Sequence, residues 1–398
     1  MDKAPSRLPS LDGLRGLAAI VVVVHHTFLT VPSLSVAYVL DGPKAVRGSN
    51  AWWLSWTPLH LVWAGGEAVI VFFVLSGFVL VRAYLDHSTV AWNAYYAKRL
   101  IRLYIPVLVA VIVAWILMVT VSRTTGSGGS TWLVSLHPGH VGLTYVIHDM
   151  VLITRPPGAV SSVLWSLHWE VIFSLLLPFF VFVAGLGRRN PWLLGLGACA
   201  LVAVSPQSDE SVYYLSIFLI GATLAAAYPR IEMWIDRRNH SATRSVLWST
   251  MIVVALLLLV SHWLIGRTLA GHGLSIYKVE AVLRVSYGVG AAMLIIAALG
   301  SAWFKELLTF RPVHWLGSRS YSLYLVHEPI IVTCAFAFGR TPSMTWFLPL
   351  MLVISLGATE VFFRLIERPS VKLASRVGAR LRSPAAPAGH AEALADLP

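Results

Sequence analysis

The chain has 398 residues, of which 57% are hydrophobic and only 12% charged, and its formal net charge is +12. Soluble globular domains contain about 25% charged residues, so this composition excludes an ordinary soluble protein. Apolar runs long enough to cross a bilayer recur along the chain, which predicts an all-α, polytopic transmembrane helical bundle. We attribute the basic excess to cytoplasmic loops and anion-binding sites, and we expect no nucleic-acid partner.

About ten spanning helices are predicted, over residues 11–31, 62–84, 101–122, 163–185, 191–206, 212–228, 246–265, 279–300, 314–337 and 345–366. Both termini are expected in the cytoplasm, because this arrangement puts about 22 of the 30 Lys and Arg residues on the inner side. The first segment has no small-residue cleavage site after it, so we expect it to be retained. The predicted location is the plasma membrane, with multiple passes.

Three regions are expected along the chain. Residues 1–366 form the membrane domain, and no second catalytic domain is expected after it. Residues 367–382 carry basic side chains at steps of four, which predicts an amphipathic helix in contact with anionic membrane lipids. Residues 383–398 are rich in Pro and Ala and are expected to be disordered.

The first predicted span, residues 11–31, contains Asp12, Arg15, His25 and His26. A charged group at the bilayer centre costs roughly 2.5–3.5 kcal/mol, so such residues usually serve a function. Arg15 and His26 are eleven residues apart, which places them on one helix face about 16 Å apart along the axis. We predict that both face a polar cavity, with His26 as a general base. A core histidine and a structural Asp12–Arg15 ion pair are the alternatives.

Polar or small residues also interrupt the next two spans. Ser76 and Gly77 lie in the middle of the second one, where they favour close helix packing, and Ser76 is a candidate for a direct role. Arg99 and Arg102, preceded by Lys98, share a face at the N-terminus of the third. Guanidinium groups at a helix N-terminus suit phosphate oxygens. The alternative is that these basic residues only set the orientation of the chain in the membrane or contact lipid headgroups.

The second long outer loop, residues 123–162, contains His137, His140 and His148. Their spacing resembles no metal site, so we expect them to be surface loop residues and expect no bound metal.

The fourth span begins with His168 and Glu170 in an apolar context. A carboxylate buried in a membrane needs a partner, and Arg15 or a histidine is the expected one. A purely structural ion pair is the alternative interpretation.

The ninth span carries Tyr321, Tyr324 and His327 at steps of three. This spacing puts a polar stripe along an otherwise apolar helix, which indicates that the stripe lines a cavity.

In this order, these motifs resemble those of the integral-membrane acyltransferase-3 family. The family's patterns are similar to Arg15-x10-His26, to residues 72–78, to Arg99-x-x-Arg102, and to residues 166–170, 320–327 and 366–369. The chain departs from the family at Ile70, where many members have an acidic residue, and at His168-Trp169, where small and apolar residues are commoner.

The resemblance implies a membrane O-acyltransferase that moves an acyl group, expected to be acetyl, from cytoplasmic acetyl-CoA or another acyl-CoA. The acceptor would be a hydroxyl of a carbohydrate or of a macrolide. Arg99 and Arg102, with Lys98, would bind the CoA phosphates. His26 would deprotonate the acceptor or carry the acyl group, Arg15 would orient it or stabilise an oxyanion, and Glu170 would orient a basic partner. The expected cavity residues are Asp12, Ser76, His168, Tyr321 and His327.

A transporter or flippase of a lipid-linked or sugar substrate is the alternative from another class. Intramembrane Arg, His and Glu residues also build proton relays. The sequence has no internal repeat of the kind found in many transporters, which weighs against this alternative.

Overall fold

The computed structural model describes residues 8–382 except 40–45, 88, 124–128, 155–156, 207, 241–242, 267–268, 270–275 and 340–341. Every regular element within these residues is a helix and none is a strand, which confirms the all-α prediction. The tail that was expected to be disordered, residues 383–398, lies outside the described residues.

The helices follow one another as α1 (Pro9–Leu29), α2 (Pro32–Val39), α3 (Asn50–Trp56), η1 (Pro58–Trp63), α4 (Gly65–Leu85), α5 (Trp92–Thr120), α6 (Thr131–Leu136), α7 (Leu143–Val151), α8 (Leu164–Leu175), α9 (Leu177–Gly187), α10 (Pro191–Val204), α11 (Glu210–Asn239), α12 (Arg244–Leu259), η2 (His262–Gly266), α14 (Ile276–Gly300), α15 (Ala302–Thr309), α16 (Arg311–Ala337), α17 (Met344–Phe362), η3 (Phe363–Glu367) and α18 (Arg368–Arg382).

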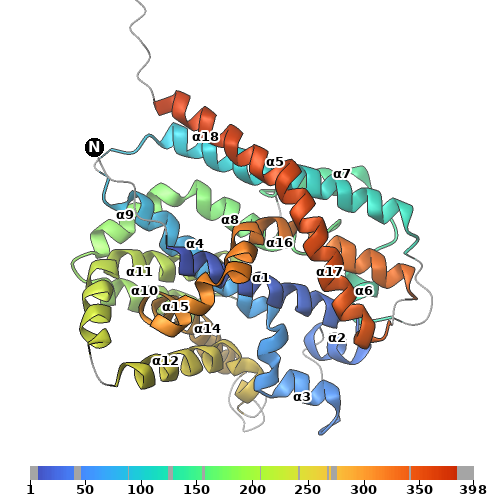
Figure 1. Cartoon of the computed structure of the whole chain (residues 1–398), viewed down its shortest axis with the longest axis horizontal. Coiled ribbons are helices and arrows are strands. Elements are labelled where there is room, and N and C mark those ends of the chain that lie inside the picture. Colours follow the sequence, from blue (N-terminus) through green and yellow to red (C-terminus); the bar gives the residue numbers. More distant parts are fainter. Residues whose placement is uncertain are drawn as a thin grey trace, which may run out of the picture.

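Helix α1 lies in the middle of the bundle and packs against α4 and α16 (Figure 1). Two glycines bring α1 and α16 into backbone contact. A Cβ atom on Gly16 would lie 2.5 Å from the Gly317 nitrogen, and one on Gly317 would lie 2.0 Å from the Asp12 oxygen. Only glycine fits such an approach, which brings the polar residues of α1 against those of α16.

A second close crossing joins α4 to α11. A Cβ atom on Gly77 would lie 2.2 Å from the Phe218 oxygen, and one on Gly221 would lie 2.1 Å from the Val74 oxygen. Gly77 therefore serves the close packing that its sequence context predicts. The contact fixes the inner face of α4, which contributes six residues to the cavity described below.

We expect Gly77→Ala to destabilise the protein by about 1–3 kcal/mol, because the added methyl group overlaps a backbone oxygen of α11. Thermal unfolding of the detergent-solubilised protein measures this. The matched control is Gly197→Ala on α10, where a Cβ atom meets nothing within 4 Å. Equal unfolding temperatures for the two variants would contradict the packing role of Gly77.

Within the described residues, six helices are long and apolar enough to cross a membrane. They are Pro9–Leu29, Gly65–Leu85, Trp92–Thr120, Glu210–Asn239, Val279–Gly300 and Met344–Arg382. The pair α8–α9 becomes a seventh span if it is counted as one bent helix. The prediction of about ten spans is thus not confirmed.

The other predicted spans are helical but differ in length or polarity. Helices α8 and α9 meet at an angle of 65°, where Pro178 in the first turn of α9 cannot continue the hydrogen-bond ladder. Helices α10 and α12 have 14 and 16 residues, fewer than the roughly 20 needed for a straight crossing. Helix α16 is long, but polar residues interrupt its middle.

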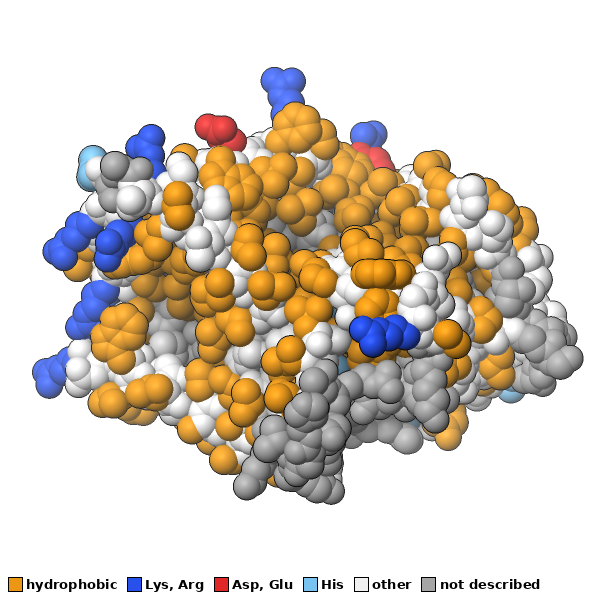
Figure 2. Space-filling view, turned by 90° about the horizontal axis from the view of Figure 1, so that it is seen from below, with side chains coloured by type: hydrophobic (Ala, Val, Ile, Leu, Met, Phe, Trp, Pro, Cys, Tyr) orange, Lys and Arg blue, Asp and Glu red, His pale blue; other side chains and the backbone are white. Residues whose placement is uncertain are grey.

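Apolar side chains cover most of the face that Figure 2 shows, and Lys and Arg gather mainly at one end of it.

Helix α18 is present where the basic amphipathic segment was expected, and it lies along α5 (Figure 1). Ser370, Ala374 and Gly378, at steps of four, form its buried face. Its location at the membrane surface stays a prediction.

Candidate active site

A cavity of about 200 Å³ lies between α1, α4, α5, α8 and α16. Apolar side chains, mostly of α4, form one part of its lining. Its polar lining consists of Arg15, Ser76, Arg99, Arg102, Ser166, Glu170, Ser320, Tyr321 and Tyr324. These residues come from five separate stretches of the sequence. Three guanidinium groups and one carboxylate line the cavity, which makes it electropositive and suited to an anion.

The lining carboxylate is paired with one of the three arginines. The Arg99 guanidinium donates a short hydrogen bond to Glu170, and its Nε donates to the Ser174 hydroxyl at 3.0 Å. The two charged side chains are only 14% and 13% exposed. We expected Arg15 or a histidine as the partner of Glu170, and this expectation is wrong. Helix α8 faces α5 here, so the carboxylate meets Arg99 first.

The other two arginines are less engaged. Arg15 forms an ion pair with Asp12, with 3.8 Å between the guanidinium nitrogen and the carboxylate oxygen. The structural ion pair that the sequence offered as an alternative is thus present, but it is long. Arg102 has an exposed side chain and no hydrogen-bond or ion-pair partner among the described residues. Arg102 is therefore free to bind a negatively charged ligand in the cavity, and Arg15 keeps a long ion pair with Asp12.

Two tyrosines of α16 fix the far wall of the cavity. The Tyr321 hydroxyl donates to the Leu103 carbonyl oxygen at 2.8 Å, which links α16 to α5. The Tyr324 hydroxyl and the Ser166 hydroxyl are 2.6 Å apart, which links α16 to α8. These bonds hold both tyrosine rings in place in the cavity wall.

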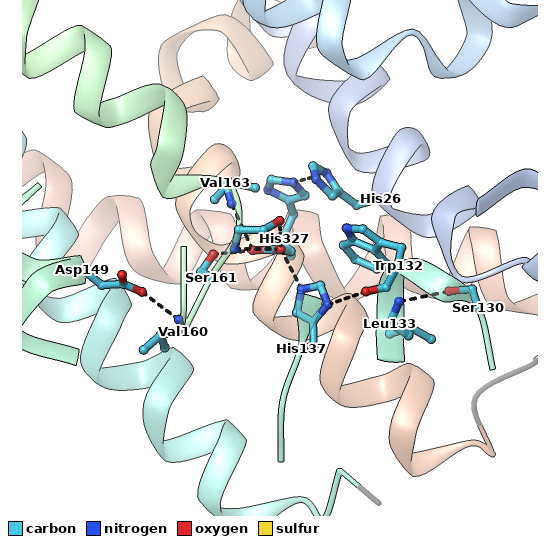
Figure 3. Close-up of polar contacts among 12 residues, drawn as sticks. His26, Ser130, Trp132, Leu133, His137, Asp149, Val160, Ser161, Val163 and His327 are labelled. Carbon is cyan, nitrogen blue, oxygen red and sulfur yellow. Dashed lines mark hydrogen bonds and ion pairs between the residues drawn. The ribbon is translucent and has the colours of Figure 1, made fainter. Parts of the chain in front are cut away.

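His26 does not line the cavity. Its Nδ1 atom lies 3.0 Å from the Val22 carbonyl oxygen and 3.1 Å from Nε2 of His327 (Figure 3). The expectation that Arg15 and His26 look into one cavity thus holds for Arg15 and is wrong for His26. The contacts that lead from the cavity to His26 pass through Tyr324, whose ring centre is 5.8 Å from that of His327.

The hydrogen bonds of the histidine pair fix its tautomers. His327 Nδ1 lies 2.8 Å from the Leu323 carbonyl oxygen, so this nitrogen carries the proton and Nε2 is an acceptor. His26 must then donate from Nδ1, toward His327 and Val22. The Nε2 atom of a neutral His26 is left with a free lone pair, as a general base or a nucleophile requires.

His25, one position away on α1, is packed as a structural residue. Its ring is 4% exposed, and its Nδ1 atom lies 2.8 Å from the Trp63 carbonyl oxygen. A Cβ atom on Gly65 would lie 2.4 Å from this ring, so the imidazole packs directly against the start of α4. The two adjacent histidines therefore have different environments.

Several predicted cavity residues lie elsewhere. His327 contacts His26, His168 bonds the Leu152 carbonyl oxygen at 2.5 Å, and Asp12 approaches Arg15 from outside the lining. Lys98 is exposed and lies toward α18. Each residue along a helix turns the side chain by about 100°, so Lys98, one residue from Arg99, and His168, two residues from Glu170, leave the faces that these two residues occupy.

Sequence reasoning missed Glu328 and misjudged His137. His137 is buried, not a surface loop residue, and its Nε2 atom lies 3.0 Å from the Glu328 carboxylate (Figure 3). A charged residue directly after His327 in an apolar span was the available signal for Glu328.

In the part of the chain that the structure describes, no group of three or more His, Cys, Asp or Glu residues is arranged to hold a metal ion.

These features define a helical membrane protein with an electropositive internal cavity beside a hydrogen-bonded histidine pair. The sequence of residues 8–363 matches the family described as "Acyltransferase domain". The chain therefore belongs to the acyltransferase-3 family, a family of enzymes, as its motifs suggested. This membership favours the acyltransferase over the transporter alternative.

Three relatives illustrate the family. "Peptidoglycan O-acetyltransferase OatA" of Listeria monocytogenes is 25% identical over 91% of this chain and 55% of its own length. "Acyltransferase MdmB" of Streptomyces mycarofaciens is 26% identical over 93% of both chains. "O-acetyltransferase OatA" of Staphylococcus aureus is 24% identical over 92% of this chain and 57% of its own. The chain thus spans little more than half the length of the two OatA proteins. No solved structure matches it.

Proposed function

We propose that this protein is a membrane O-acyltransferase that moves an acetyl group from acetyl-CoA, or another acyl group from its CoA thioester, to an acceptor hydroxyl. The acceptor class is a carbohydrate, as in peptidoglycan, or a macrolide. The observation that carries the proposal is the convergence of Arg15, Arg99 and Arg102 on one internal cavity in a member of this family.

The donor would bind with its phosphates at the arginines. The cavity volume of about 200 Å³ is below the roughly 300–1,000 Å³ of a pocket that encloses a drug-sized ligand. We therefore assign only the acyl-bearing arm to the cavity and the phosphates to the exposed guanidinium of Arg102, with Arg15 deeper inside. Glu170 is a positioning residue in this scheme, because it holds Arg99 in place.

The chemistry would take place at Nε2 of His26. As a general base, this nitrogen takes the proton of the acceptor hydroxyl while the oxygen attacks the thioester carbonyl, and the imidazolium then protonates the departing CoA thiolate. As a nucleophile, it attacks the thioester carbonyl, and the carbon–sulfur bond breaks to release the thiolate; the acceptor oxygen then takes the acyl group from Nε2, and the hydroxyl proton passes to the thiolate. In either route the acyl group would reach His26 past Tyr324, which lines the cavity and whose ring contacts that of His327.

For the topology we propose a multi-pass protein of the plasma membrane with about ten crossings and both termini in the cytoplasm. The clustering of Lys and Arg at one end of the face in Figure 2 supports this orientation. Helices α10, α12 and α16 would then cross with their neighbours covering their short or polar parts.

Coenzyme A is expected to raise the unfolding temperature of the purified protein, and Arg102→Ala is expected to weaken its apparent affinity about 10- to 100-fold, as for a lost charge-assisted contact. Arg102 has no hydrogen-bond or ion-pair partner among the described residues, and the buried Glu367 carboxylate, whose charge interacts with it, should keep its bonds to Ser322 in the variant. Thermal-shift titration with coenzyme A measures the effect, and Arg311→Ala, an exposed arginine outside the cavity, is the control. An unchanged titration curve for Arg102→Ala would remove the donor site.

Acyl transfer itself is tested with the purified protein in lipid nanodiscs, radiolabelled acetyl-CoA, and peptidoglycan fragments or a macrolide as acceptor. Label in the acceptor supports the proposed function. The absence of label from every acceptor hydroxyl supplied, at a coenzyme A concentration that saturates the thermal shift, would contradict it.

A further inference from the structure

Glu328 of α16 is fully buried, and its carboxylate accepts more hydrogen bonds than any other side chain around the histidine pair. Its Oε1 atom accepts from the backbone nitrogen and the hydroxyl of Ser162, at 3.0 and 2.5 Å, and from Nε2 of His137 at 3.0 Å. Its Oε2 atom accepts a short bond from the Ser161 hydroxyl and a 3.4 Å bond from the Val163 nitrogen. The charge is thus compensated by donors from two other segments.

One of these segments is the start of α8. The Ser162 and Val163 amides precede Leu164, the first residue of that helix, and have no partner inside it. The Glu328 carboxylate binds the turn that leads into α8, where its charge favours the positive end of the helix dipole. Glu328 therefore fixes α8 against α16 at their shared end.

The other segment is α6, which lies against His26. The His137 Nδ1 atom donates to the Trp132 carbonyl oxygen of α6 at 3.2 Å, and the Trp132 ring centre is 5.5 Å from that of His26 (Figure 3). A bond between the Ser35 hydroxyl and the Trp132 nitrogen, at 2.8 Å, ties the same turn to α2. Glu328 thus reaches, through His137, the indole ring that covers His26.

We propose that Glu328 is a positioning residue for acyl transfer: it locks α6 and α8 onto α16 so that His327 and Trp132 hold the His26 ring in one orientation. The inference rests on the proposed function of His26. His327 directly precedes Glu328 on α16, and Tyr324, one turn earlier, bonds Ser166 of the same α8. The bonds of Glu328 to the turn before α8 and this hydroxyl pair therefore keep the two helices in one register beside the histidines.

The test compares Glu328→Gln with Asp149→Asn in the full-length protein. An amide keeps the size of Glu328 but replaces one of its acceptor oxygens by a donor, which then opposes the Ser161 or Ser162 donors. We expect the kcat of Glu328→Gln to fall about 10- to 100-fold, in the range of a lost supporting hydrogen-bond partner, with the KM for acetyl-CoA unchanged. Turnover is normalised to the donor-binding sites titrated with coenzyme A, so that loss of folded protein does not count.

Asp149 is the matched control. It is a buried carboxylate that accepts backbone N–H groups of Gly158, Ala159 and Val160 in the same loop, but it makes no recorded contact with α16. Asp149→Asn should loosen that loop and keep normalised kcat within about twofold. If both variants lose the same normalised turnover, general loosening of the loop explains the effect and the proposal is overturned.

Hydrogen–deuterium exchange gives a readout that does not depend on activity. Glu328→Gln should raise exchange in residues 129–137 and in the first turn of α8, and leave the Arg99 region of α5 unchanged. His137→Gln removes a single contact and decides the question if Glu328→Gln cannot be purified; it should show a smaller loss of normalised kcat in the same direction. Full normalised turnover in both variants overturns the inference, whereas an inactive wild-type protein would instead contradict the proposed function.

Discussion

Replacement of His26 by alanine is expected to reduce acyl transfer by about 10²- to 10⁴-fold, the usual contribution of a general base, while coenzyme A still raises the unfolding temperature. The reason is that donor binding and the chemical step are assigned to different residues. The donor cavity is lined by the arginines and does not include His26, whereas the Nε2 atom of a neutral His26 keeps a free lone pair for the chemical step. Single-turnover transfer from labelled acetyl-CoA, at saturating donor, measures the effect.

The matched control is His25→Ala, at the next position of α1. His25 is bonded to the Trp63 carbonyl oxygen and wedged against Gly65, so this variant should lose stability but keep turnover per folded molecule. His327→Gln should resemble a mild form of His26→Ala, because it removes the group that fixes the His26 tautomer. Wild-type turnover in His26→Ala would remove the proposed chemistry.

Breaking the Arg99–Glu170 pair is expected to have the largest effect on stability. Each single variant, Arg99→Ala or Glu170→Ala, leaves a nearly buried charge without its partner, which costs about 3–5 kcal/mol. The double variant removes both charges and should be destabilised by less than the sum of the two, with a coupling of about 0.5–3 kcal/mol. Denaturant unfolding in detergent measures all three free energies.

The chain supplies a control pair in Arg188 and Asp86. These side chains are also in ion-pair contact but are 44% and 70% exposed, so solvent screens them. Arg188→Ala should cost about 0–1 kcal/mol. If the Arg99 and Arg188 variants lost equal stability, or if the Arg99 and Glu170 effects were additive, the buried pair would not have the role assigned to it.

Much of the lining could be predicted because a membrane rarely tolerates a polar residue without a purpose. Arg15, Ser76, Arg99, Arg102 and Tyr321 were singled out on that ground, and the structure brings all five to one cavity with Glu170. Their chemical roles stay predictions. The same reasoning overlooked Glu328, because a Glu next to Pro329 inside an apolar helix was not weighed against partners more than 150 residues away.

Composition and hydropathy by themselves determined that this is a helical membrane protein, and the order of its motifs indicated its family. These properties depend on local sequence: a long apolar segment must satisfy its backbone hydrogen bonds internally, whatever surrounds it. The tertiary structure alone decided that Glu170 pairs with Arg99, that His26 pairs with His327 outside the cavity lining, and that His137 is buried. Each outcome depends on which helix faces turn toward each other, and a rotation of one residue, about 100°, exchanges a cavity residue for one on another face.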